Sequence, residues 1–256
     1  MGIEYEELET RREKAKTIIG GLKKRNIEGF YCQTKEEALK LVTELVPDGA
    51  SAGWGGSVTL KQLGLFDALR EKGCRLFDMD EANGDPELSA KIYQDSVGAD
   101  YFFMSTNGIT ENGELVNIDG AGTRLSRMIY GPKQVVIIAG INKISPDVQT
   151  AIDRIQNEVC PVLAVAGGRN TACSNLGRCG NCFTPDSMCC EFVITRKSRQ
   201  NGRMKLILVG EELGYERMGN RRGGRARRDG CFGLRVSFAG GFGFLRMVLD
   251  GRFEGE

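Results

Sequence analysis

The residues with the clearest chemical potential are cysteines, because five of the nine fall between Cys173 and Cys190. They follow the spacing Cys173-x5-Cys179-x2-Cys182-x6-Cys189-Cys190, in a segment otherwise rich in Ser, Asn, Gly and Pro (171–190, the Cys-rich loop). Two cysteines separated by two residues place two sulfurs on one metal, and two more complete a four-thiolate shell. Since apolar burial does not explain cysteines in so polar a loop, we predict Cys173, Cys179, Cys182 and Cys189 as metal ligands.

The identity of the metal stays open. An all-cysteine shell serves both structural zinc and iron–sulfur clusters, and the spacing matches neither the ferredoxin run nor a common zinc-finger pattern. Free or redox-active thiols are the alternative to any metal. A strand entering at Glu191 would point Cys189 and Cys190 to opposite faces, so only one of them should ligate. The scattered Cys32, Cys74 and Cys160 are predicted to be small core residues.

The chain contains no histidine. This excludes Ser-His-Asp and Cys-His catalysis, histidine general bases and every metal site that uses an imidazole. Any acid–base chemistry must come from Asp, Glu, Lys, Tyr or Cys.

A Gly-rich loop covers Gly53-Trp54-Gly55-Gly56-Ser57-Val58-Thr59, between a predicted strand and a predicted helix. Glycines let backbone N–H groups close around an anion, and a helix N-terminus adds partial positive charge. The segment fits neither the P-loop nor the G-x-G-x-x-G pattern. We predict a substrate or anion site at Gly55, Gly56, Ser57 and Thr59. Ser57 is also the natural N-cap of the helix. The alternative is a tight turn that merely needs glycine.

Three more polar segments follow predicted strands, where parallel sheets place ligand sites. In Ser105–Thr110 the candidate is Asn107, for substrate binding. In Asn117–Arg124, Asp119 is the best carboxylate for acid–base work and Arg124 the best anion clamp. Lys143 follows the strand at 135–139, can face the Gly-rich loop and is the second candidate catalytic residue beside Asp119. The competing interpretations are that Asp119 holds a turn and that Lys143 is simply solvated.

The elements that must position these residues alternate between strand and helix. Strands are predicted at 29–32, 50–53, 74–77, 99–104, 135–139, 192–195 and 205–209, and helices at 57–71, 86–96 and after Asp147. Thr34 and Glu37 form a capping box, and Asn112-Gly113 a turn. This alternation indicates an α/β fold with a largely parallel sheet and helices on both faces. The predicted organisation is an N-terminal helix in 1–28, a domain in 29–215 and a tail in 216–256.

Bulk properties set further limits. With 35 basic and 34 acidic side chains the chain offers no general attraction for nucleic acid. Its acidic N-terminus is unlike a signal peptide and no apolar run is long enough for a membrane span, so a cytoplasmic protein without membrane contact is expected. The tail changes in composition, with nine Arg, no Lys and ten Gly among 41 residues. It is predicted to be either a disordered or aberrant extension or a nucleic-acid tether.

Taken together, several segments resemble the lactate-utilisation (LUD) domain family. They are Gly55–Thr59, Thr106–Thr110, Glu114–Gly120, Gly140–Lys143, the Cys-rich loop and Gly210–Tyr215. The resemblance covers about residues 5–215 and leaves the tail without a counterpart. It implies a fold similar to ribose-5-phosphate isomerases and CoA transferases. It also implies a role in oxidising lactate to pyruvate beside iron–sulfur partner proteins, and it favours Gly55, Gly56, Ser57, Asn107, Asp119 and Lys143 as site-lining residues.

Two functions remain open. In the first, the chain is an accessory protein or subunit of lactate oxidation, an oxidoreductase component that binds a small carboxylate or phosphate at the Gly-rich loop and an iron–sulfur cluster at the Cys-rich loop. In the second, it is a non-redox binding or assembly protein with structural zinc. No nicotinamide or flavin fingerprint is present, so the chain alone is not expected to oxidise lactate.

Overall fold

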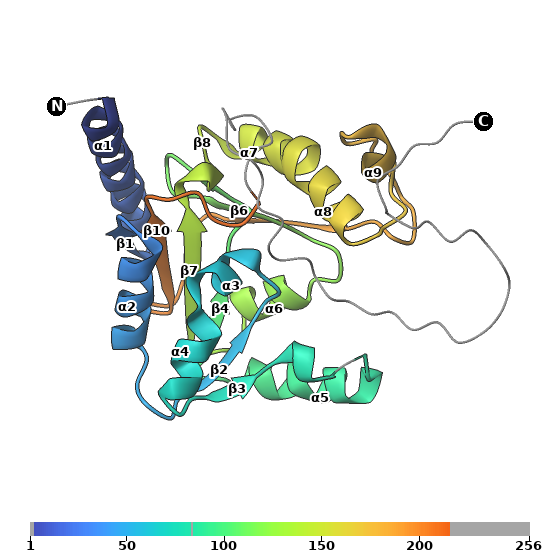
Figure 1. Ribbon diagram of the computed structural model, residues 1–256, viewed down its shortest axis with the longest axis horizontal. Helices are drawn as coiled ribbons and strands as arrows, with labels where there is room; N and C mark the ends of the chain where they lie inside the picture. The colour runs from blue at the N-terminus through green and yellow to red at the C-terminus, as the bar shows by residue number, and fades with distance from the viewer. Residues whose placement is uncertain (1–2, 83, 216–256) are drawn as a thin grey trace, which may run out of the picture. The chain divides into compact units, whose positions relative to one another are not determined.

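The computed structural model describes residues 3–82 and 84–215, which form an α/β domain containing two β-sheets (Figure 1). All pairings in the six-stranded main sheet are parallel, in the order β1-β10-β7-β4-β2-β3. Its strands are β1 (Glu28–Cys32), β2 (Ser51–Trp54), β3 (Arg75–Phe77), β4 (Tyr101–Met104), β7 (Gln134–Gly140) and β10 (Met204–Val209). The prediction of a largely parallel sheet is confirmed. The predictions made for the tail fall outside the described residues.

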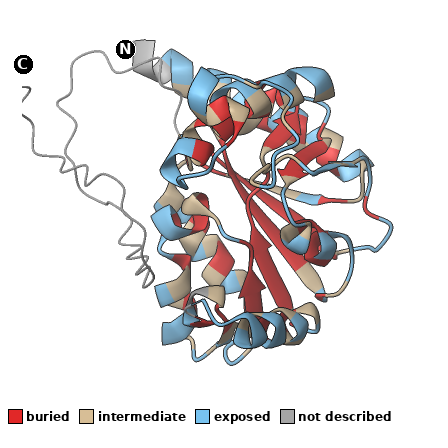
Figure 2. Cartoon of the chain, turned by 90° about the vertical axis from the view of Figure 1, so that its right-hand side faces the viewer, coloured by how far each residue is buried: buried red, intermediate tan, exposed pale blue. Residues whose placement is uncertain are grey.

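The central strands of this sheet are buried on both faces, as Figure 2 shows. In β4, Phe102 and Phe103 are both fully buried, and they point into different apolar clusters on opposite faces. Unbroken apolar runs such as this one are typical of parallel strands covered on both sides, because successive side chains alternate between the faces.

Helices cover both faces, as predicted. On one face lie α2 (Lys35–Leu45), α3 (Val58–Leu63) and α4 (Leu65–Glu71). The other face carries α1 (Ile3–Lys24) and α6 (Thr123–Ile129). Ala15, Ile18 and Leu22 of α1 are at most 1% exposed and share a cluster with β7 and β10, so the N-terminal helix belongs to the core. Beside β3, α5 (Pro86–Val97) packs with the 3-10 turn η1 (Met79–Ala82).

A second, four-stranded sheet was not predicted. It has the order β8-β5-β6-β9, formed by β8 (Ile144–Ser145), β5 (Gly108–Thr110), β6 (Leu115–Asp119) and β9 (Glu191–Thr195). Strands β5 and β6 are antiparallel, which confirms the turn at Asn112-Gly113. The strand predicted at 192–195 exists, but it pairs with β6 in this sheet. Helices α7 (Val148–Arg154) and α8 (Cys160–Ala166) pack on Val116 and Ile118 of β6.

The helix predicted at 57–71 is divided in two. Gly64 takes a left-handed conformation with φ of 71°, ending α3 and beginning α4. Glycine adopts this conformation without steric cost, so it reverses the local helix geometry where another residue would be strained.

The helix predicted after Asp147 runs further than its apolar pattern suggested. It begins at α7, passes through a π-helical turn, η3 (Ile155–Val159), and continues as α8. Pro161 lies just after this turn. Because proline has no N–H and its ring crowds the carbonyl four residues earlier, the helix must widen there to continue. No helix in the described part of the chain is both long and apolar enough to span a membrane.

Candidate functional site

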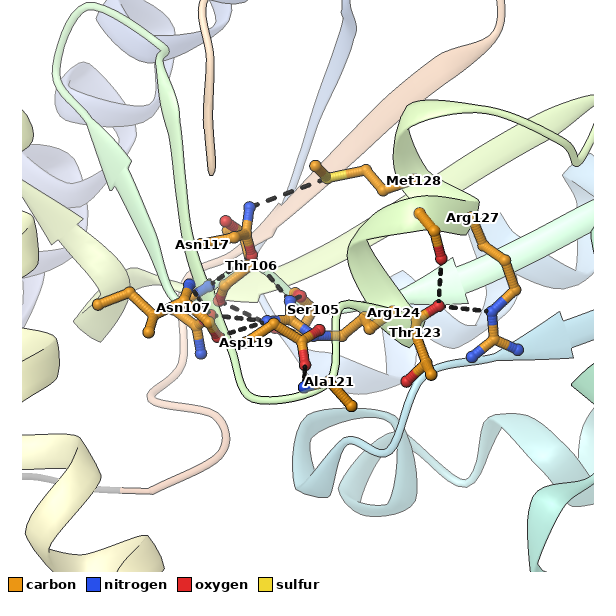
Figure 3. Close-up of polar contacts among 12 residues, drawn as sticks. Ser105, Thr106, Asn107, Asn117, Asp119, Ala121, Thr123, Arg124, Arg127 and Met128 are labelled. Atoms are coloured by element: carbon orange, nitrogen blue, oxygen red, sulfur yellow. Dashed lines mark hydrogen bonds and ion pairs between the residues drawn. The ribbon is translucent and has the colours of Figure 1, made fainter. Parts of the chain in front are cut away.

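Arg124, near the start of α6, is the centre of a polar network that joins the loop after β4 to strand β6 (Figure 3). Its Nη1 donates to Ser105 O (3.2 Å) and Asn117 Oδ1 (2.8 Å), and its Nη2 donates to Asn107 Oδ1 and Ile118 O (both 2.9 Å). Its Nε lies 3.5 Å from Asp119 Oδ2. A guanidinium has five N–H donors, of which four make these hydrogen bonds while the fifth, on Nε, faces the Asp119 carboxylate. Arg124 therefore organises the loops, whereas the sequence had suggested that it would clamp an anion.

Asn107 and Asn117 complete this network. Asn107 Oδ1 also accepts from Ile118 N (3.0 Å), and Asn117 Oδ1 accepts from Asn107 N (3.2 Å). Asn117 is fully buried and its Nδ2 points to Met128 Sδ (Figure 3). Each amide oxygen thus accepts from both a backbone N–H and Arg124, which fixes the loop after β4 against β6.

Asp119 holds a turn and pairs with Arg124. Its Oδ1 accepts from Ala121 N (3.3 Å), the local turn that was the alternative to an acid–base role. Its Oδ2 is buried, faces Arg124 and accepts no hydrogen bond from the described residues. The carboxylate is therefore placed where it compensates the buried Arg124 charge.

The glycines of the Gly-rich loop differ in what surrounds them. A Cβ at Gly55 would lie 2.7 Å from Arg124 Cγ and 2.8 Å from Cδ, so only glycine lets the arginine lie across the loop. A Cβ at Gly56 would meet no atom within 4 Å. Ser57 caps α3 by accepting from Leu60 N (3.4 Å), as predicted. Gly55 is therefore needed for packing, and Gly56 borders open space.

That open space is a pocket of about 460 Å³ between the Gly-rich loop, α5 and α6. Its walls are apolar at Trp54, Met79, Ala90 and Tyr93, and polar at Ser89, Gln94 and Thr123. Gly55, Gly56, Arg124 and Arg127 complete the lining. This volume suits a small ligand, and the mixture of apolar walls with a few convergent polar groups is typical of ligand sites.

Arg127 gives the pocket its unbalanced charge. The residue is only 3% exposed and is held over the rings of Phe102 and Tyr93, with its carbon Cζ 4.6 and 5.0 Å from their centroids. Its Nε donates to Thr123 O and its Nη1 to Ser96 Oγ, both at 3.0 Å. Arg127 forms no ion pair with any carboxylate of the described residues. Its Nη2 donates no hydrogen bond to any of those residues. Burial lowers the pKa of Arg127, as expected for a cation with little compensation.

Lys143 ends the 3-10 turn η2 (Ile141–Lys143) after β7 and does not line this pocket. Its Nζ donates to Thr59 Oγ1 (2.9 Å) and to Ser105 Oγ, which itself donates to Ile138 O (2.6 Å). Burial, together with the positive charges of Arg154 and Arg124, lowers the pKa of Lys143 to about 7. The structure thus joins Lys143 to Thr59 through a hydrogen bond and disfavours the charged form of the amine.

The segment 210–214 covers Lys143. Leu213 N donates to Asn142 Oδ1 (3.2 Å), Ile141 N donates to Glu211 O (3.1 Å), and Gly214 N donates to Gln62 Oε1 (2.7 Å). A Cβ at Gly214 would lie 3.5 Å from Lys143 Nζ. These contacts cover the Lys143 amine from the side of β7, and the residue as a whole is half-buried.

The Cys-rich loop brings fewer sulfurs together than the sequence predicted. Cys173 is buried in an apolar cluster, which Cys160 shares and against which Cys189 packs. The sulfurs of Cys160 and Cys189 are 3.5 Å apart. Within residues 3–82 and 84–215, no three side chains of Asp, Glu or Cys converge as a metal site would require. The four-thiolate shell therefore stays a prediction.

Hydrogen bonds reach several of these sulfurs. Asn181 N donates to Cys179 Sγ (3.4 Å), with Asn181 in the left-handed conformation. The hydrogen bond from Cys160 lowers the pKa of Cys189 to about 7, and the same contact together with burial raises the pKa of Cys160. Backbone hydrogen bonds, above all at Ala172, lower the pKa of Cys182. These contacts favour thiolates in the loop.

The sequence did not lead us to Arg127 as part of the pocket, or to Cys160 as a contact of the Cys-rich loop. Arg127 lies three residues after Arg124 on a helix, a spacing that puts both on one side of it, and this signal could have identified it. Cys160 was assigned to the core, where it does lie. Nothing in its local sequence connects it with Cys189.

Comparison with solved structures gives a DUF162 family protein from Deinococcus radiodurans, with 9% sequence identity and a TM-score of 0.44 over 78% of this chain and 98% of that one. A D-ribose-5-phosphate isomerase in complex with phospho-erythronic acid matches at 15% identity and a TM-score of 0.30, over 44% of this chain and 53% of its own. The ribose 5-phosphate isomerase of Plasmodium falciparum matches at 23% and 0.28, over 43% and 52%. The comparison with curated proteins returned no match.

The family comparison is decisive. The model of the LUD domain matches residues 15–209, which run from within α1 to the end of β10. This match covers well over half of the 256 residues and includes the Gly-rich loop, the Arg124 network and the Cys-rich loop. The chain belongs to the LUD domain family.

Proposed function

We propose that this chain is an accessory protein or subunit of lactate utilisation that binds a small carboxylate or phosphate in the pocket beside the Gly-rich loop. The observation that carries the proposal is Arg127, a buried guanidinium without an ion pair among the described residues, in the lining of a pocket of ligand size. Burying a charge without a partner is costly, so a bound anion would supply the missing compensation. Membership of the LUD domain family supports a role in lactate utilisation. The sequence resemblance described above supports iron–sulfur proteins as partners.

The arrangement also suggests how an anion would be held. Arg127 would supply the charge, and Thr123 and Ser89 hydroxyl groups lie in the same lining. Trp54 and Tyr93 would shield a short carbon chain from water. Arg124 is already fully engaged, so it would fix the pocket wall and add electrostatic attraction. Lys143 does not line the pocket. It would influence the ligand only indirectly, through its hydrogen bond to Ser105.

The test is calorimetry with L-lactate, pyruvate and inorganic phosphate on three proteins. We expect one anion to bind wild type, and Arg127→Met to weaken that binding at least tenfold, since a hydrogen bond to a charged group contributes about 1.5–3 kcal/mol. Gly56→Val should leave unfolding unchanged, because its Cβ meets open space, and should still weaken binding by obstructing the pocket. Absence of heat with every anion, or equal affinity in all three proteins, would refute the proposal.

We also propose a metal centre at the Cys-rich loop, favoured by the hydrogen bond from Asn181 N to Cys179 Sγ. Backbone N–H donors on sulfur stabilise thiolates at such centres. An iron–sulfur cluster fits the electron-transfer setting of the proposed function. Structural zinc fits the alternative, a non-redox binding or assembly protein.

Metal analysis and an absorption spectrum of anaerobically purified protein separate these outcomes. We expect Cys179→Ser to lose bound metal and Cys190→Ser to keep it, because Cys190 is exposed and directs its sulfur to Ser187 O. A coloured, iron-containing protein supports the cluster, and a colourless one with stoichiometric zinc supports the alternative. Wild type without either metal, or Cys179→Ser with a full complement, would exclude the centre.

A further inference from the structure

Cys160 and Cys189 form a two-sulfur contact. Cys189 is also one of the four predicted ligands of the proposed metal centre, so the pair is available for other chemistry when the chain carries no metal. Cys160 is the first residue of α8, directly after the π-helical turn, and Cys189 lies in the Cys-rich loop two residues before β9. Their sulfurs are 3.5 Å apart although the residues are 29 positions apart in sequence. The fold has therefore brought a helix thiol and a loop thiol into van der Waals contact.

The two cysteines of the pair differ in how deeply they are buried. Cys160 is 6% exposed within the cluster that contains Val116 and Ile118, and Cys189 packs against that cluster only partly buried. Cys189 is therefore the more exposed member of the pair, and Cys160 is the buried one. An accessible thiol beside a buried one is the arrangement in which the first is oxidised and the second resolves the product.

We propose that Cys160 and Cys189 are an oxidation site that forms a reversible disulfide with hydrogen peroxide. The Cys189 thiolate attacks one peroxide oxygen, the O–O bond breaks, and a sulfenic acid and one water result after protonation. The Cys160 sulfur then attacks the Cys189 sulfur as its thiol gives up its proton, the S–O bond breaks, and the hydroxide takes up the proton and leaves as a second water. Two thiols lose two electrons and two protons, and one peroxide becomes two waters.

The geometry requires little rearrangement. A disulfide bond is about 2.05 Å long, so the sulfurs must approach by about 1.5 Å. Cys189 stands outside any helix or strand and can supply this shift. Closing the bond would tie the start of α8 to the loop that contacts Asp119, whose carbonyl accepts from Cys190 N (2.9 Å). Oxidation would thus restrain the backbone beside the Arg124 network.

The experiment uses the full chain, reduced, treated with a chelator and then exposed to hydrogen peroxide. Peptide mapping should find one Cys160–Cys189 linkage, removed by dithiothreitol, and the midpoint of thermal unfolding should rise by about 5 °C or more because a loop is closed. Cys190→Ser, the matched control, should form the same linkage.

In Cys160→Ala, dimedone should instead trap a sulfenic acid on Cys189, and peroxide should not raise the unfolding midpoint. If Cys160→Ala is unstable, Cys189→Ser provides the same comparison, since it should leave Cys160 reduced. Linkage of Cys179 to Cys182 or of Cys189 to Cys190 in wild type, or Cys160 and Cys189 reduced after other cysteines have oxidised, would overturn the proposal.

Discussion

Replacing Arg124 with Met should lower the free energy of unfolding by about 3–5 kcal/mol, as expected when one member of a buried charged pair is removed. The variant would leave Asp119 buried without its cation, and would take a donor from the side-chain oxygens of Asn107 and Asn117. It would also take a donor from the carbonyls of Ser105 and Ile118. Unsatisfied buried acceptors cost more than the hydrogen bonds contributed, so the loss should exceed that of a surface arginine.

Chemical denaturation monitored by circular dichroism measures this effect. The control is Arg178→Met, because Arg178 is exposed. Gly55→Ala should destabilise in the same direction, since its methyl group would displace the Arg124 side chain. An Arg124→Met protein within about 0.5 kcal/mol of wild type, the usual range for surface changes, would show that the network does not hold the loop after β4 against β6.

Stability should increase with pH between 7 and 9 because of Lys143. Its pKa is about 7 in the folded protein against 10.5 in the unfolded chain, so over this range the unfolded state binds more protons. Burying the charged ammonium of Lys143 destabilises the folded state. This destabilisation is fully present well below pH 7 and is lost as the pH rises, because the buried amine gives up its proton. A difference of one bound proton between the two states makes the unfolding free energy rise by at most about 1.4 kcal/mol per pH unit.

The measurement is the difference in unfolding free energy between wild type and Lys143→Met at several pH values. Other titrating groups cancel in this difference, which should rise in favour of wild type by about 2–3 kcal/mol from pH 7 to pH 9. Lys197→Met, at an exposed lysine, is the control and should give a flat difference. A flat profile for Lys143→Met would mean that the amine stays charged throughout.

Strand order explains why much of the candidate site could be predicted from sequence. The Gly-rich loop follows β2, Asn107 follows β4 and Lys143 follows β7, and these three strands are neighbours in the sheet. Parallel strands place their carboxyl ends at one edge, so polar residues after each strand meet there. The buried run at 135–139 and the Asn112-Gly113 turn were similarly local signals that the structure confirms.

What could not be predicted depends on partners distant in sequence. The positions of the glycines in the sequence could not show that these two neighbours have different roles. Gly55 makes room for the Arg124 side chain, whereas Gly56 faces a pocket. The contact of Cys160 with Cys189 arises from the packing of α8 on the second sheet, and that sheet mixes short strands from three regions of the chain. Strands of two or three residues carry too little periodicity to be recognised.

The position of β10 has a consequence for how the protein is made. β1 emerges from the ribosome among the first elements, yet its partner in the main sheet is β10, which is separated from it by about 170 residues of chain. β10 also pairs with β7, so it is the piece that joins β1 to the rest of the sheet. Such long-range pairing is slow to form. A nascent chain that stops before Met204 would hold β1 as an unpaired edge and should need protection from aggregation until synthesis passes Val209.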